Sequence, residues 1–92
     1  MNTLKAEKRD MSIKAKKLRR EGFVTGNLFG RELEASIPLK FDKAEIERLL
    51  KVESKGGQVM LEVAGETYDA LIKEVDYNPL KGYVDEIDFQ AL

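Results

Sequence analysis

The sequence has 92 residues, of which 42% are hydrophobic, and it contains neither cysteine nor histidine. This length suits one domain with a single modest core, and the missing cysteines exclude disulfide bonds and thiolate metal sites. The formal net charge of −1 hides an asymmetry, because residues 1–31 hold nine basic and three acidic residues whereas the other 61 hold seven basic and fourteen acidic ones.

The two parts therefore carry charges of +6 and −7. Such a split predicts that the amino-terminal part faces a polyanion, although a basic helix that is merely solvated is the more ordinary interpretation of a charge run. No run approaches the roughly 18 apolar residues that a membrane span needs. Polar residues follow Met1 at once, so we expect no signal peptide and a cytoplasmic location.

The predicted elements begin with a short strand over residues 3–9, in which Leu4 and Ala6 alternate with charged residues. A helix follows over residues 11–22, with Asp10 or Ser12 as its expected cap and Gly22 as its expected end. At about 100° per residue, one apolar stripe contains Met11, Ala15, Leu18 and Gly22. The rest of the helix surface carries the cations Lys14, Lys16, Lys17, Arg19 and Arg20.

The middle of the chain predicts two strands and a second helix. Residues 23–30 are uncharged and predict a strand that anchors the basic helix to a sheet. Residues 33–41 predict another strand, which Pro38 places at an edge or a bulge because proline cannot donate a ladder hydrogen bond. Asp42 as cap, Glu45 three residues later and the flanking Phe41 and Ile46 predict a helix start. We expect this helix only to cover the core.

The last third predicts three strands, over residues 58–63, 67–75 and 83–89, joined by turns at residues 64–66 and 78–82. In the last strand, alternation places Tyr83, Ile87 and Phe89 on one face and Val84, Glu86 and Asp88 on the other. The predicted fold is therefore mainly β. We expect a small six-stranded antiparallel β-barrel with two short helices, formed by residues 1–92 as one domain.

The residue inventory argues against an enzyme. Without histidine or cysteine the chain lacks the usual base and thiol nucleophile, and its three serines lie outside any nucleophile-elbow pattern. Asp76, Asp85, Glu86 and Asp88 predict a solvated edge, since neighbours on a strand point to opposite faces. We expect no catalytic residues, no cofactor, no metal site and no small-molecule substrate.

The order of several short motifs resembles the bacterial large-subunit ribosomal protein L twenty-five family, which includes the general stress protein Ctc. The motifs are KKLRREG at residues 16–22, LFG at 28–30, IKEV at 72–75, NPLK at 78–81 and IDF at 87–89. The likeness runs over nearly all the chain. It implies a six-stranded barrel that binds the loop E region of 5S ribosomal RNA in the large ribosomal subunit, without a membrane, and that is a monomer off the ribosome.

The resemblance also implies which residues bind RNA. Basic side chains would meet phosphates and groove edges, Phe29 stands where the family usually has tyrosine, and Asp88 matches the family's terminal aspartate. The resulting RNA-binding set is Arg9, Lys14, Lys16, Lys17, Arg19, Arg20, Phe29, Lys73 and Asp88.

Besides Phe29, three more residues depart from the family pattern. Tyr77 stands where a basic residue is common, and Asn78 and Glu86 replace histidines. Glu86 puts a carboxylate where RNA phosphates would approach, which predicts repulsion. One alternative is therefore a diverged relative that keeps the barrel, lacks the 5S RNA site and acts as a protein-interaction or stress-related module. Another is a general electrostatic binder of nucleic acid.

Overall fold

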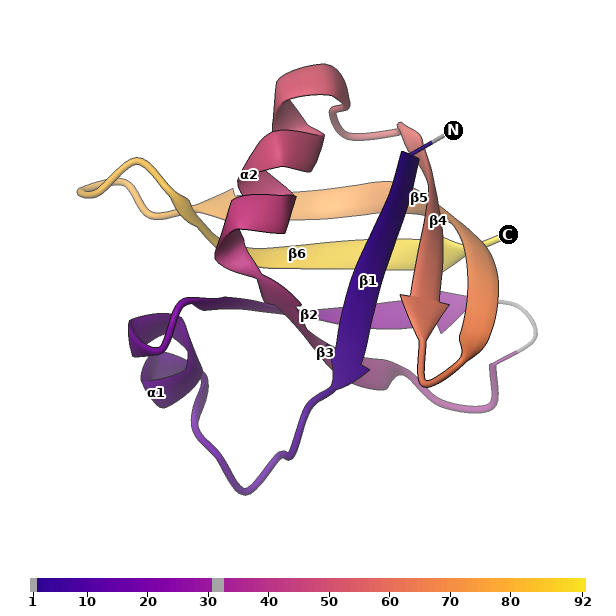
Figure 1. The fold of residues 1–92 in the computed structure, drawn as a ribbon, viewed down its shortest axis with the longest axis horizontal. Helices are drawn as coiled ribbons and strands as arrows, with labels where there is room; N and C mark the ends of the chain where they lie inside the picture. Colours follow the sequence, from indigo (N-terminus) through magenta and orange to yellow (C-terminus); the bar gives the residue numbers. More distant parts are fainter. Residues whose placement is uncertain (1, 31–32) are drawn as a thin grey trace.

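The computed structural model describes residues 2–30 and 33–92. Arg31, one of the nine basic residues of the amino-terminal part, lies outside the described residues. The elements in chain order are β1 (Asn2–Lys8), α1 (Ala15–Arg20), β2 (Phe23–Gly30), β3 (Ile37–Asp42), α2 (Lys43–Val52), β4 (Gln58–Val63), β5 (Glu66–Tyr77) and β6 (Val84–Ala91). Figure 1 shows α2 lying across the strands while α1 lies beside the start of β2.

The described strands close into a barrel in the order β1-β3-β2-β6-β5-β4. This confirms the predicted six-stranded barrel with two helices, except that the sheet is mixed. β1 is parallel to β4 and β2 is parallel to β6, whereas the other four pairs are antiparallel. The hairpin turns visible in the sequence set only the direction of consecutive strands, so the two parallel pairs arise from closure of the barrel.

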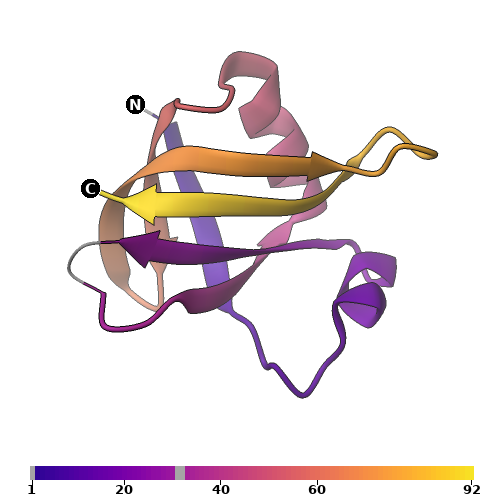
Figure 2. The same ribbon diagram turned by 180° about the vertical axis from the view of Figure 1, so that it is seen from behind.

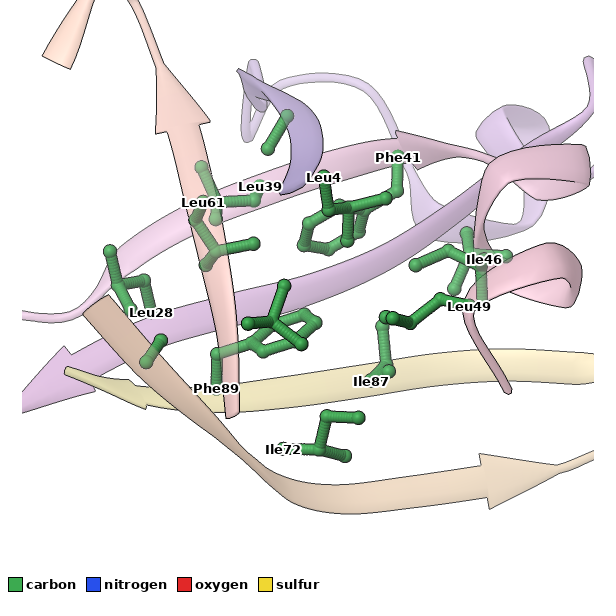
Figure 3. Packing of buried hydrophobic residues seen from close by; sticks show 14 of the residues in the cluster. Leu4, Leu28, Leu39, Phe41, Ile46, Leu49, Leu61, Ile72, Ile87 and Phe89 are labelled. Atoms are coloured by element: carbon green, nitrogen blue, oxygen red, sulfur yellow. The ribbon is translucent and has the colours of Figure 1, made fainter. Parts of the chain in front are cut away.

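The core fills the barrel with alternating inward residues of all six strands. Phe41 of β3 and Phe89 of β6 meet near its centre with ring centroids 5.4 Å apart. Ile46 and Leu49 of α2 point into the same cluster and cover one end of the barrel (Figure 3). The predicted cap of α2 is confirmed, since Asp42 Oδ1 accepts a hydrogen bond of 2.9 Å from the backbone N–H of Ala44. The Glu45 carboxylate instead accepts from Arg48.

The basic helix is shorter than predicted. It begins at Ala15, with Lys14 as an N-cap that makes no side-chain bond, and Met11 is 63% exposed. Asp10 Oδ1 accepts bonds of 2.9 Å from the N–H of Ser12 and 2.7 Å from its hydroxyl. These local bonds also lower the pKa of the Asp10 carboxyl. They offer the backbone a turn in place of a helical start, which is why Asp10 and Ser12 do not cap α1.

Two strand predictions are also wrong in detail. Pro38 does not lie in an edge strand, because β3 pairs with both β1 and β2. The carbonyl of Pro38 accepts a hydrogen bond from the N–H of Arg9, just after the end of β1. The nitrogen of Pro38 lies on the same side of β3, where β1 has already ended, so the ladder requires no N–H from this residue. In β6, Val84 is buried together with Ile87 and Phe89, because a register shift makes Asp85 an extra residue opposite Asp76 and Tyr77.

The turn between β4 and β5 offers a test of local strain. Its two central residues, Ala64 (φ 50°) and Gly65 (φ 83°), both have left-handed backbones, which is the two-residue hairpin geometry that favours Asn-Gly. We expect Ala64→Asn to raise the free energy of unfolding by about 1 kcal/mol, because asparagine tolerates this backbone better than alanine. Urea unfolding followed by circular dichroism measures the change.

Gly65→Ala provides the matched control for this turn. Nothing lies within 4 Å of a Cβ added at Gly65, so backbone strain alone should lower the free energy of unfolding by about 1 kcal/mol. Equal stabilities for the parent chain and Ala64→Asn would contradict the strain assigned to Ala64.

None of the helices in the described residues is long and apolar enough to cross a membrane.

Candidate nucleic-acid interface

The short helix α1 presents basic side chains to solvent. Leu18, which is 2% exposed, is its buried residue, and α1 packs against β2. The N-cap position and the solvent-facing side of α1 carry exposed basic side chains. We call the four exposed cations the basic platform: Lys14, Lys16, Lys17 and Arg20. Together with Ser12 and Ile13, the platform lines a shallow hollow. Among the described residues, no carboxylate forms an ion pair with the platform.

Arg19 points away from the platform toward the wall of the barrel. Its Nε donates to the backbone oxygen of Asp85 (3.2 Å) and its Nη2 donates to the hydroxyl of Thr25 (3.3 Å). Nη2 also lies 3.6 Å from the carboxylate of Glu86. Because Asp85 is the extra residue of the β6 bulge, the bulge supplies the carbonyl that holds Arg19. The helix thus contributes one cation to a site on β2 and β6.

Arg9 approaches the same region from the end of β1. Its Nη2 donates a 3.4 Å bond to the carbonyl of Ile13, while its Nε is buried without a hydrogen-bond partner in the described structure. Arg9 and Arg19 both act electrostatically on Glu86. Two of the predicted cations therefore act on one carboxylate of β6, Arg19 through an ion pair and Arg9 through its charge.

The outer face of β6 carries two half-buried carboxylates. Thr25 lies opposite Glu86 and Asn27 opposite Asp88 in the β2–β6 ladder. Asp88 Oδ1 accepts from the backbone N–H of Asn27 (3.1 Å) and from its side-chain amide (3.4 Å). Figure 2 shows β5, β6 and β2 side by side in this wall, with α1 beyond the start of β2. Asp88 is thus fixed in place with one oxygen engaged by β2.

Glu86 has an unusual electrostatic environment. Burial raises the pKa of its carboxyl above the ordinary value, and Asp88 and Asp76 raise it further, against the opposite effect of Arg19 and Arg9. Asp76 lies opposite Glu86 in the β5–β6 ladder. The prediction of a solvated edge holds for Asp76, which is exposed, but is wrong for Glu86 and Asp88, which are half-buried at alternate positions of β6. Within the described residues these three carboxylates do not form a cluster suited to hold a metal ion.

Phe29 and Lys73 lie away from the basic platform. Phe29 is half-buried and pairs with Gln90, four residues beyond Thr25 on β2, which is about 13 Å along a strand. Lys73 is exposed at a register shift in β5, and β6 separates β5 from β2. The structure therefore groups the basic platform at α1 and directs Arg19 and Arg9 toward Glu86, two residues before Asp88 on β6, whereas no such contact joins Phe29 or Lys73 to these residues in the described part of the chain.

Comparison with known proteins shows which family the chain belongs to. A model of the Ribosomal L25p family matches residues 4–89, from β1 to β6. The chain belongs to the Ribosomal L25p family. The match includes α1 and the Glu86 and Asp88 carboxylates of β6, so the candidate interface lies inside the family region.

Two relatives illustrate the similarity of this Ribosomal L25p chain to named proteins. The large ribosomal subunit protein bL25 of Caldanaerobacter subterraneus subsp. tengcongensis is 33% identical over 91 residues, covering 98% of this chain and 46% of the relative. The general stress protein Ctc of Bacillus subtilis is 29% identical over 94 residues, covering 100% of this chain and 46% of the relative. This chain thus spans less than half the length of these relatives.

Sequence reasoning missed two lysines, Lys43 and Lys81, which gather at the Tyr83 ring of this Ribosomal L25p chain. Lys43, at the start of α2, lies 3.8 Å from the centre of the Tyr83 ring, and Lys81 lies 5.8 Å from it. The N–H of Lys43 donates to the carbonyl of Gly22, two residues after the end of α1. The sequence signal was a lysine immediately after the Asp42 cap, but its proximity to α1 depends on this long-range bond.

Proposed function

We propose that this chain is a module of the large ribosomal subunit that binds the loop E region of 5S ribosomal RNA. In this proposal residues 1–92 act as one domain, in the cytoplasm and without catalysis. The single observation that carries it is the basic platform, whose four exposed cations have no ion-pair partner among the described residues and are mounted on a barrel of the Ribosomal L25p family. The loop E ligand comes from the family resemblance of the motifs.

The proposed roles follow from the geometry. The basic platform contacts phosphates, since lysine and arginine gain affinity by releasing counterions from the RNA backbone. Asp88, with Asn27 beside it, supplies a fixed acceptor for a donor on a base edge or a ribose hydroxyl in the wide minor groove. Lys43 and Lys81 extend the positive charge beyond the end of α1. Phe29 and Lys73 would meet the RNA only if it follows the wall of the barrel.

A second candidate function is a protein-interaction or stress-related module that has kept the barrel and lost the RNA site. The observation in its favour is the Glu86 carboxylate, which lies 3.6 Å from Arg19 and would repel phosphate. A third is non-specific binding of nucleic acid, which the basic platform alone would support.

A gel-shift titration over a salt series separates the three functions. The duplex probes are loop E and an unrelated RNA of equal length. We expect preferential binding of loop E and a plot of log affinity against log salt with a slope of about −3 to −4, as about four phosphate contacts would produce. Equal affinity for both duplexes would indicate a general binder. Binding of neither would favour the diverged module.

A further inference from the structure

Arg19 differs from the basic platform because the free protein already occupies its guanidinium group. Asp85, Thr25 and Glu86 all contact it, at 3.2, 3.3 and 3.6 Å respectively. Arg19 and Glu86 are each 30% exposed at the side chain, so the pair is partly withdrawn from water yet reachable. An RNA phosphate that binds Arg19 must therefore compete with a carboxylate of this chain.

The carboxylate is itself unfavourably placed. It lies near Asp88 on its own strand and Asp76 on β5, while the charges that favour it come from Arg19 of α1 and Arg9 after β1. Its partner in the β2–β6 ladder is the neutral Thr25. Burial and these two acids raise the pKa of Glu86, which means that the ionised group is poorly stabilised even with two arginines nearby.

We propose that Glu86 acts as an internal competitor of RNA, holding Arg19 against the barrel wall in the free protein and releasing it only when a phosphate replaces the carboxylate. This inference rests on the proposed function for its choice of ligand. According to this inference, Glu86 lowers the affinity of the chain for RNA, because Arg19 must first lose its carboxylate partner. The effect is strongest for RNAs that place a phosphate beside β6.

Neutralising Glu86 tests the competition directly. We expect Glu86→Gln to bind the loop E duplex about threefold to tenfold more tightly at low salt, because a half-exposed carboxylate no longer opposes phosphate at Arg19. The gain should shrink in the Arg19→Gln background, since there is then no guanidinium to release. Gel shifts of the parent chain, both single variants and the double variant give the four affinities, and circular dichroism melts verify folding.

Glu74→Gln is the matched control. Glu74 also lies on the outer face of the β5–β6 ladder, opposite Asp88, but its ion pair is with Lys55, outside the candidate RNA-binding set. The Glu74→Gln substitution removes the same charge as Glu86→Gln, and it should change the affinity for the loop E duplex by less than twofold. If Glu86→Gln is misfolded, Glu86→Ala serves the same comparison.

The pH dependence gives a second readout. Because Glu86 has a raised pKa, it takes up its proton before ordinary carboxylates as the pH falls. The affinity advantage of Glu86→Gln over the parent should therefore decrease on acidification, because the parent then also carries an uncharged side chain at position 86.

The outcomes judge the inference separately from the proposed function. Tighter binding by Glu86→Gln that depends on Arg19 supports the competition, even if the parent binds no RNA. Unchanged or weaker binding by a folded Glu86 variant, or an equal gain with Glu74→Gln, would overturn it. The proposed function depends instead on the preference of the parent chain for loop E over the unrelated duplex.

Discussion

Replacing Lys14, Lys16 and Lys17 together by glutamine should weaken binding of the loop E duplex by about a hundredfold at about 0.1 M salt. The three lysines belong to the basic platform and line one hollow beside α1. Each phosphate contact that is lost removes its share of counterion release, so the slope of log affinity against log salt should flatten by about 2 to 3. The same salt series of gel shifts measures both effects.

A charge-matched variant distinguishes a local site from a general effect of net charge. Lys5, Lys51 and Lys55 are also exposed but lie on β1, on α2 and in the loop after it. Their joint replacement by glutamine changes the net charge equally and should weaken binding by less than about threefold. Equal losses for the two triple variants would contradict a platform centred on α1. Because the substituted side chains are exposed, both variants should keep the melting temperature of the parent.

The second large effect concerns the barrel itself. Gly26→Ala should destabilise the fold by about 3 kcal/mol or more, because a Cβ at this position would collide with the backbone carbonyl of Ile87 and lie 3.2 Å from the Phe41 ring. Gly26 and Ile87 are partners in the parallel β2–β6 ladder. The added methyl group must push apart the two strands that carry Thr25, Asn27, Glu86 and Asp88. Urea unfolding and a loss of loop E affinity would report the two consequences.

Gly56→Ala is the comparison for this substitution. Gly56 has a φ of 90°, and nothing lies within 4 Å of a Cβ added there. Its replacement should therefore cost only the strain of a left-handed alanine, about 1 kcal/mol. A Gly26→Ala protein no less stable than Gly56→Ala would mean that β2 and β6 are not as closely paired as described.

Family membership rests on the match over most of the chain, whereas the candidate interface rests on the positions of individual side chains. The Ribosomal L25p match extends from residue 4 to residue 89 and includes most of every barrel strand. RNA recognition by individual residues is a separate question, on which Glu86 is the most informative position because its carboxylate contacts Arg19. Substitutions of the basic platform and of Glu86 in the same chain therefore separate the contribution of the exposed cations to RNA binding from the effect of the Glu86 carboxylate.

The sequence by itself determined the local elements of this protein. Alternation predicted β4 and its buried Val59, Leu61 and Val63, and the Asp42 cap predicted the start of α2. These features depend on contacts between residues a few positions apart, so that side-chain periodicity and turn chemistry specify them. Four of the five cations assigned to the basic helix are exposed as predicted, whereas Arg19 is half-buried against the barrel wall. Local bonds between Asp10 and Ser12 delayed the start of α1.

Only the tertiary structure decided which strands are parallel and what Arg19 contacts. The bond from Arg19 to Asp85 joins residues 66 positions apart, and it exists because β2 and β6 pair in parallel and a bulge shifts the register of β6. Closing a barrel selects these pairings through the packing of all its strands at once, and that choice leaves no local pattern in the sequence. Sequence alone could therefore place cations and carboxylates in the chain, but not Arg19 against Glu86.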